Sequence, residues 1–391
     1  MTWSLYGVLS LMMFLEFAVW GAWAPVLAAR LLGPLGMNGK QTGWIYATLP
    51  LASIFAPLAA GPVADLWIAA KWILVAAHLA GAVLLVVAAR QEKFGGLFAA
   101  MFLYSICFAT TLPLVNAVLF ANLTDVGKES GGIFIWGPIA WALVGYFLTG
   151  WRWIFKTEGQ GRDCLYLAAA LSVLMGIGCL FLPQAAEHSS SLVAAAKQLL
   201  GDPNFLVFLV VSMAIAGTIQ FYFLGTGRFL QDMGVSGKNV SASMGMAQAV
   251  QALATWLALM AVFLPGLLGF KLTLILGAAC WLAMYAIYVA GRPRPLILAS
   301  QGLHGLAYVF FIIVGQMYCN AVGVGIKNSI QALLSAATMG VGLFLGTQAA
   351  GWVLDRFTVN GRFQWRRIWL VPALVTLAGI VALAAGFANP P

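Results

Sequence analysis

Long apolar stretches dominate this chain and restrict it to one kind of environment. A transmembrane helix needs about 20 mostly apolar residues. Twelve stretches of about that length follow one another near residues 4–29, 42–64, 72–89, 96–122, 132–151, 164–183, 205–227, 240–264, 270–290, 295–319, 328–353 and 368–387. The mean hydropathy is +0.95 and only 8% of the residues are charged, a composition that soluble domains do not have. The sequence therefore predicts a protein that crosses a membrane many times.

The length and composition of these stretches favour helices over strands. Backbone polar groups in hydrocarbon must be hydrogen-bonded within a helix or a closed barrel. The stretches are too long and too poor in alternating polar residues for barrel strands. The first stretch has no basic segment before it and no small-residue cleavage site after it, so we expect a retained span. We predict an all-α membrane protein with twelve transmembrane helices.

An internal repeat divides the chain into two similar halves. The segment Arg30–Lys40 (RLLGPLGMNGK) recurs in altered form as Arg228–Lys238 (RFLQDMGVSGK), about half the 391-residue chain later. Each copy follows a long apolar run, so each half begins with a similar hairpin. We predict two pseudo-symmetric six-helix bundles, residues 1–183 and 205–391, joined by a polar central linker at residues 184–204.

Several classes of function are excluded by the polar residues. The net charge is +9, but the basic residues are scattered singly through short loops and form no patch for nucleic acid. The five cysteines have no CxxC spacing, and the three histidines have no ligand partners at helical spacing, so we expect no metal site and no cofactor. No GxxxxGK(S/T) phosphate-binding pattern is present, and a converging set of catalytic acids is lacking. Two duplicated helical halves are typical of secondary transporters rather than enzymes.

Glu16 is the one acidic residue that falls well inside a predicted span. It lies roughly midway along the first stretch, where an unpaired carboxylate is costly enough to favour its neutral form. Such a group can carry a proton during transport, or it can stay protonated and hydrogen-bond two helices together. Both interpretations remain open. Asp65 and Asp355 lie at span ends, where we expect structural roles.

Polar and aromatic side chains recur at helical spacing in the second half. Residues of each set are three to four positions apart and therefore share one face of a helix. The first set is Gln248, Gln251 and Thr255, and the second is Gln301, His304, Tyr308 and Phe311. A further amide, Gln220, lies in the seventh span. Amides both donate and accept hydrogen bonds, which suits a neutral polar ligand. Polar residues in membrane bundles also bond neighbouring helices, which is the better interpretation for any single glutamine. Two aligned sets together favour a binding site.

Four segments in chain order resemble the nucleoside:proton symporters of the major facilitator superfamily. They are FLEFAVWGAW (14–23), GPVADLWIAAKW (61–72), IWGPIAW (135–141) and LHGLAYVFF (303–311). The resemblance implies the major facilitator fold, a central nucleoside site and symport driven by the proton gradient. It also implies a conformational loop motif at Gly61 and Asp65, although Leu66 replaces the basic residue that normally follows the aspartate.

The resemblance implies a substrate site in which some family positions are kept. Trp141, Gln220, Gln248, Tyr308 and Phe311 match aromatic or amide positions of the family. These side chains suit base stacking and amide recognition. Together with Gln251 and His304 from the helical sets, they form the predicted substrate-binding residues.

The family's charged positions are replaced in this chain. Phe134 stands at the arginine, Gln251 at the glutamate and Val309 at the aspartate of the family pattern, while Pro138 stands at its threonine. Removing a set of buried charges together is physically coherent, because each charge left alone costs several kcal/mol. The resemblance therefore leaves Glu16 and His304 as the candidates for proton coupling.

The charge of the loops conflicts with the orientation that the family implies. With both termini cytoplasmic, five of the twenty Lys and Arg residues lie in cytoplasmic loops and fifteen lie in the opposite loops. The positive-inside rule predicts the reverse. We favour the family orientation, because the loop motif normally faces the cytoplasm.

The combined prediction is a monomeric transporter of the cell (inner) membrane that moves nucleosides by alternating access. Its partners are the lipid bilayer, the nucleoside and, if transport is coupled, protons. Two alternatives remain: a passive facilitator for another small neutral polar solute, and a protein that binds its ligand without transporting it. A facilitator fits the neutralised interior, and its uptake would not respond to a collapsed proton gradient.

Overall fold

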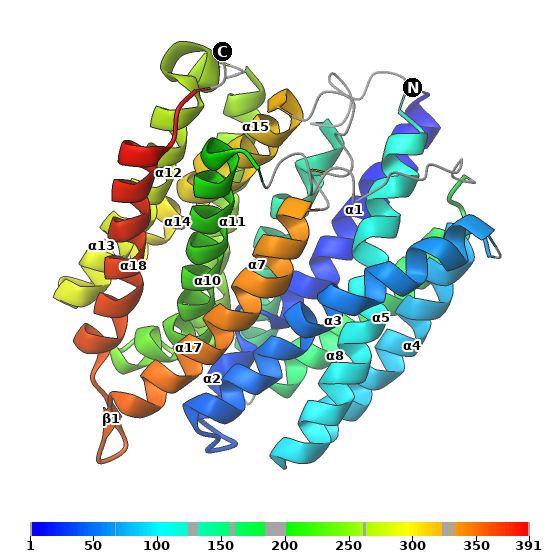
Figure 1. The fold of residues 1–391 in the computed structure, drawn as a ribbon. Helices are drawn as coiled ribbons and strands as arrows, with labels where there is room; N and C mark the ends of the chain where they lie inside the picture. The colour runs from blue at the N-terminus through cyan, green and yellow to red at the C-terminus, as the bar shows by residue number, and fades with distance from the viewer. Residues whose placement is uncertain are drawn as a thin grey trace. The chain divides into compact units, whose positions relative to one another are not determined.

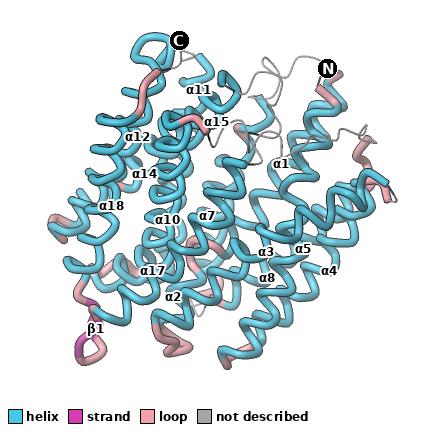
Figure 2. The backbone as a smooth tube through the Cα atoms, viewed as in Figure 1, coloured by secondary structure: helices cyan, strands magenta, loops and turns pink. Residues whose placement is uncertain are grey.

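Helices account for almost all of the described structure. The computed structural model describes residues 2–66, 68–123, 132–156, 161–183, 201–260, 263–322, 330 and 333–389. Figure 2 shows helices throughout this part of the chain, with one short antiparallel hairpin of β1 (Thr358–Val359) and β2 (Arg362–Phe363). A helical fold satisfies the backbone hydrogen bonds within each segment, which hydrocarbon requires. The all-α prediction is confirmed.

The chain forms two compact units, which are described separately. Unit 1 comprises Met1–Ser189 and Gly227–Gln248, and unit 2 comprises Ser190–Thr226 and Ala249–Pro391. The hairpin that contains the second copy of the repeat thus groups with unit 1. The bundle boundaries at 183 and 205 remain predictions, because most of the predicted linker, residues 184–200, lies outside the described residues.

Unit 1 packs its helices around the first one. Its helices are α1 (Trp3–Trp23), α2 (Leu27–Leu32), α3 (Gly39–Leu66), α4 (Ala70–Arg90), α5 (Phe94–Ala121), α7 (Trp136–Ile154) and α8 (Arg162–Cys179). Helix α1 contacts α5, α7 and α8, and α4 lies between α5 and α8. Unit 1 also takes the end of α10 (Pro203–Asp232), the turn η1 (Gly237–Asn239) and the start of α11 (Val240–Met260).

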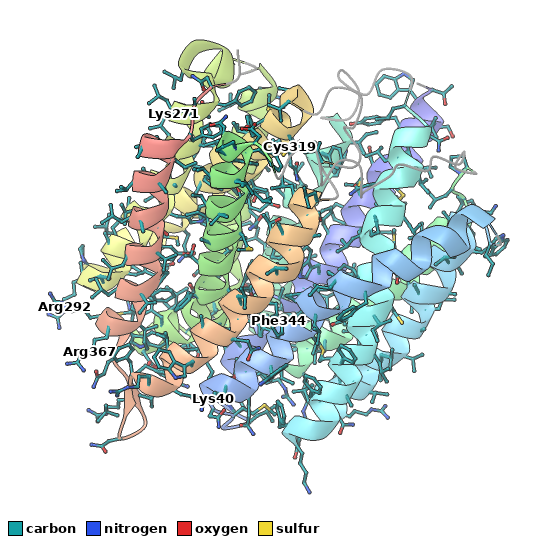
Figure 3. The ribbon with its side chains drawn as sticks, in the orientation of Figure 1. Lys40, Lys271, Arg292, Cys319, Phe344 and Arg367 are labelled. Atoms are coloured by element: carbon teal, nitrogen blue, oxygen red, sulfur yellow. The ribbon has the colours of Figure 1, made fainter. Side chains whose placement is uncertain are left out.

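Unit 2 is organised around α12. Its remaining helices are α12 (Phe263–Ala290), α13 (Arg294–Ala299), α14 (Gln301–Ala307), α15 (Val314–Val322), α17 (Leu343–Arg356) and α18 (Trp365–Gly386), with π-helical segments η2 (Tyr308–Ile313) and η3 (Ala336–Gly342). Helix α12 packs against α18, α14 and η2 (Figure 1). Within this unit, Lys271 lies at one end of the helices and Arg292 and Arg367 lie at the other (Figure 3).

Ten of the described helical segments are long and apolar enough to cross a membrane. The predicted spans 42–64 and 240–264 correspond to α3 and α11, which are not among the ten. Helix α11 carries buried Ser241, Gln248 and Gln251, and such polar residues lower the hydropathy of a helix whose polar groups face the protein interior. The structure thus shows a multi-pass membrane protein, without confirming the count of twelve.

The two copies of the repeat adopt matching turns. Gly36 and Gly234 occupy equivalent positions, and both have positive φ, at 59° and 86°. In each copy the glycine N–H donates a hydrogen bond to the carbonyl oxygen three residues earlier. Gly36 donates to Gly33 at 3.0 Å, and Gly234 donates to Gln231 at 2.9 Å. Only glycine adopts this left-handed backbone without steric cost, which explains why the glycine recurs in both copies.

Close helix contact in unit 2 depends on the absence of a side chain at Gly346. A Cβ atom there would lie 2.3 Å from the carbonyl oxygen of Gly217, so α10 and α17 would have to separate. We expect Gly346→Ala to lower the stability of the purified protein by about 1–3 kcal/mol. Thermal unfolding checks this, with Gly150→Ala as the control, because a Cβ at Gly150 meets nothing within 4 Å. Equal melting temperatures for the two variants would contradict the close packing.

Candidate functional site

Glu16 forms a buried ion-pair contact with His78 inside unit 1. The Oε2 atom of Glu16 on α1 lies 3.0 Å from Nε2 of His78 on α4, and both side chains are 1% exposed. The two atoms are close, but their contact lacks the alignment of a hydrogen bond, and neither atom has another hydrogen-bond partner among the described residues. The carboxyl group and the imidazole thus lie side by side, shielded from solvent.

Two hydroxyl groups complete this cluster from two further helices. Thr111 on α5 donates to Oε1 of Glu16 at 2.7 Å. Ser172 on α8 donates to the main-chain oxygen of His78 at 2.8 Å, and its Oγ also lies 3.2 Å from Nδ1 of His78. Four helices of unit 1 thus converge on one carboxyl group and one imidazole.

His78 is a functional candidate that sequence reasoning missed. Its position far along the chain from Glu16 places it in a different predicted span, and no local spacing connects the two. The one available signal is chemical, because a carboxyl group and an imidazole inside apolar spans each need a polar partner. The packing of α4 beside α5 and α8, which surround α1, brings them together.

Three further ion pairs lie at helix ends. Arg152, near the end of α7, donates to both carboxylate oxygens of Asp163 at 2.6 and 2.9 Å, and its Nη1 donates to Ser241 at 3.1 Å. Arg162 pairs with Glu92 in an exposed position, and Arg228 pairs with Asp232 at 3.0 Å. The contact between Glu16 and His78 differs from these pairs because it lies at mid-span and is fully buried.

In unit 2, Gln301 is held by two tyrosines. Its Oε1 accepts a hydrogen bond from the Tyr222 hydroxyl at 2.7 Å, and its Nε2 donates to the Tyr288 hydroxyl. Gln301 is fully buried, as are both tyrosines. This amide has protein partners at both ends and joins α10, α12 and α14.

His304 is packed as closely as Gln301. Its Nδ1 accepts a hydrogen bond from the indole N–H of Trp281 at 3.0 Å, so this nitrogen is unprotonated. Its ring stacks on Tyr222 with centroids 4.1 Å apart, and the side chain is 1% exposed. The contacts of His304 thus lie within unit 2, and its predicted roles in substrate binding and proton coupling remain predictions.

Tyr308 and Phe311 fall in a π-helical segment. Helix α14 ends at Ala307 and η2 continues from Tyr308 to Ile313, so the face predicted for a continuous α-helix does not extend through this stretch. Phe311 is buried, with its ring 6.0 Å from that of Trp281, whereas Tyr308 is half-buried. Single-turn π-helical bulges occur frequently at functional sites, which supports interest in this segment.

The polar set on α11 includes groups without partners. Gln248, Gln251 and Thr255 are all buried, at 8%, 5% and 8% exposed. Oε1 of Gln251 and Oγ1 of Thr255 have no hydrogen-bond partner among the described residues. A buried acceptor without a donor costs free energy, and a bound ligand or water removes that cost. Gln220 on α10 is also buried, at 5% exposed.

Trp141 lies against the first helix of unit 1. Its ring is 5.6 Å from that of Trp20, edge to face, and a Cβ on Gly21 would lie 2.9 Å from its Cγ. Trp141 is 9% exposed, so most of its ring is buried against α1. The predicted loop motif falls at the end of α3, where Gly61 and Asp65 are helical and their side chains lie outside the described residues.

Apolar helices in two units, with buried polar side chains at mid-span, define a multi-pass membrane transporter. The family described as nucleoside H+ symporter matches residues 4–391, and the chain belongs to this family. Its members are transporters rather than enzymes, as predicted.

Known proteins of this type are similar along almost the whole chain. Putative nucleoside transporter YegT of Escherichia coli (strain K12) is 29% identical and covers 94% of this chain and 90% of its own length. Nucleoside permease NupG of the same organism is 26% identical, and the match covers 97% of this chain and 95% of the permease. The crystal structure of nucleoside transporter NupG matches with a TM-score of 0.84 at 26% identity, over 99% of this chain and 100% of that one. The predicted family and the transporter fold are confirmed.

Proposed function

We propose that this protein transports nucleosides across the cell (inner) membrane by alternating access, together with protons. The full-length match to the nucleoside H+ symporter family carries the proposal. Three similar proteins are a putative nucleoside transporter, a nucleoside permease and a xanthosine permease, and these names describe nucleoside transport. We further propose that the protein has twelve membrane-spanning helices, which include α3 and α11, and that it functions as a monomer.

The polar chemistry of unit 2 supports a neutral ligand with hydrogen-bond donors. Gln251 offers an unpartnered acceptor, and Thr255, one turn along the same helix, offers a hydroxyl. Both side chains are uncharged, which suits a neutral ligand. Tyr308 in the π-helical segment adds an aromatic ring for a base. Trp141, Gln220, Gln248, His304 and Phe311 remain candidate contacts.

Counterflow in proteoliposomes tests the substrate. Vesicles loaded with unlabelled uridine or adenosine are expected to take up the labelled nucleoside transiently, because exchange needs no net driving force. Vesicles loaded with an equal concentration of ribose are the control. Absence of exchange with either nucleoside, while another neutral solute exchanges, would replace the nucleoside by that solute.

We propose that both chain termini are cytoplasmic, against the bias of the Lys and Arg residues. Lys71 lies in the first turn of α4 and Lys93 lies in the loop that follows its last residue, Arg90, so the two ends of one helix are compared. After replacement of the native cysteines, an impermeant maleimide added to intact cells is expected to label Lys93→Cys and to leave Lys71→Cys unlabelled. Labelling of Lys71→Cys alone would reverse the orientation.

A further inference from the structure

We propose that Glu16 and His78 form the proton-binding site of this transporter, which holds one proton in one state of the cycle and two in the other. The inference rests on the proposed symport function and assigns the proton to residues of unit 1. It also explains how the chain carries protons without the charged residues that are replaced at Phe134, Gln251 and Val309.

The geometry requires at least one proton on the pair. Ser172 has one hydroxyl proton, which it donates to the His78 carbonyl oxygen at 2.8 Å, so its Oγ accepts from Nδ1–H at 3.2 Å. The remaining contact is Nε2 to Oε2 at 3.0 Å. Two lone pairs at that distance in a dry interior repel each other, so a proton lies on one of the two atoms. The one-proton pair has no net charge, whether it is ionised or neutral.

A place for a second proton is built into the contact with Thr111. The Thr111 hydroxyl lies 2.7 Å from Glu16 Oε1 and also 2.7 Å from the carbonyl oxygen of Phe108, yet it has only one proton to donate. When Oε1 is unprotonated, Thr111 donates to it. When Oε1 carries a proton, it donates to the Thr111 oxygen, and Thr111 donates to Phe108. Both states are hydrogen-bonded with the heavy atoms in the same places.

The surroundings of the pair favour coupling to a conformational change. Besides His78, the titratable side chains near Glu16 in the described part of unit 1 include Tyr104 on α5 and Cys179 on α8, and neither is charged in its protonated form. Arg152, at the end of α7, is bound to Asp163. Because both members of the pair are 1% exposed, a proton cannot exchange with water in this conformation. Loading and release therefore need a conformational change that admits water to the pair.

The proton step is a simple transfer. The step begins from the pair whose first proton lies on Nε2 of His78. A hydronium ion on the outer side gives a proton to Oε1 of Glu16 and leaves water behind. After the conformational change, the Oε1–H bond breaks and the proton passes to water on the inner side, which regenerates the one-proton pair. No other bond changes, and the nucleoside moves in the same direction.

Infrared spectroscopy tests the site without a nucleoside. A pH step on the purified protein is expected to produce a carboxylic-acid C=O band that is absent in Glu16→Gln. Ser105→Ala is the control, because Ser105 donates a buried hydrogen bond to Thr48 at 2.9 Å in the same unit and lies outside the pair. A difference spectrum of Glu16→Gln identical to that of the wild type would overturn the proposal, whatever the transported solute is.

The pH dependence of uridine binding tests coupling. Linkage to one proton allows the wild-type Kd to fall by up to about ten-fold per pH unit on acidification. Glu16→Gln is expected to bind uridine with no pH dependence, to exchange it in counterflow, and to lose accumulation driven by a proton gradient. His78→Gln removes the imidazole beside the carboxyl group, so its pH dependence is expected to differ from that of the wild type.

The outcomes separate this inference from the proposed function. If the wild type neither binds nor exchanges uridine or adenosine, the nucleoside assignment fails and the infrared result still decides the site. If the wild type couples uptake to protons and Glu16→Gln does the same, the transport function stands and Glu16 is excluded. If Glu16→Gln does not fold, an unshifted pH dependence in His78→Gln contradicts the pair.

Discussion

Replacement of Asp163 by alanine is expected to lower the free energy of unfolding by about 3–5 kcal/mol, because it leaves a buried guanidinium without its counter-charge. Arg152 is 3% exposed and donates to both oxygens of Asp163. Asp163 Oδ1 also accepts from the backbone N–H of Cys164 at 2.9 Å, near the start of α8. The substitution thus removes an ion pair and a helix-end hydrogen bond together. Thermal unfolding in detergent measures the loss.

The exposed pair of the same unit provides the matched control for this prediction. Glu92 and Arg162 are 66% and 41% exposed, and exposed pairs contribute about 0–1 kcal/mol. Glu92→Ala is therefore expected to unfold within a few degrees of the wild type. Asp163→Asn, which keeps the acceptor without the charge, is expected to lie between the two alanine variants. Equal melting temperatures for Asp163→Ala and Glu92→Ala would contradict the structural role of the buried pair.

Gln251→Leu is expected to weaken uridine binding while leaving stability unchanged or slightly higher. In the described structure Oε1 of Gln251 is buried without a partner, so its removal deletes an unsatisfied acceptor. A nucleoside that donates to this oxygen loses a hydrogen bond of about 1 kcal/mol, equivalent to a roughly five-fold higher Kd. Binding of labelled uridine and thermal unfolding are measured on the same preparation.

Gln301→Leu is the comparison variant, because it is expected to lower stability, whereas Gln251→Leu is not. Both ends of the Gln301 amide are bonded to buried tyrosines, Tyr222 and Tyr288. Its removal takes one hydrogen bond from each of these two buried hydroxyl groups, so stability is expected to fall by about 1–3 kcal/mol. A Gln251→Leu protein that loses stability as Gln301→Leu does, and binds uridine normally, would remove Gln251 from the substrate site.

The fold was largely predictable because its main determinants are local in sequence. Apolar runs of membrane-spanning length indicate helices, and the repeated Gly36 and Gly234 mark turns that require positive φ. The division of the chain into two units was harder to predict from the sequence. It depends on how the hairpin at Gly227–Gln248 packs, and that packing is not encoded in any one span.

The candidate site was predictable only in part. Glu16 was identified because a carboxyl group at mid-span is unusual, but its partner His78 comes from a different helix and depends on three-dimensional packing. The π-helical segment at Tyr308 was missed for a related reason. The spacing rule assumes an unbroken α-helix, and the change of hydrogen-bond pattern at Ala307 has no signal in the residue types.

Proton-driven nucleoside accumulation is the most direct test of the central claim. Purified protein in proteoliposomes is given labelled uridine or adenosine, with and without an imposed proton gradient. The account predicts uptake above the external concentration with the gradient, and equilibration after an uncoupler collapses it. Uptake that only equilibrates in both conditions would contradict symport and indicate a passive facilitator.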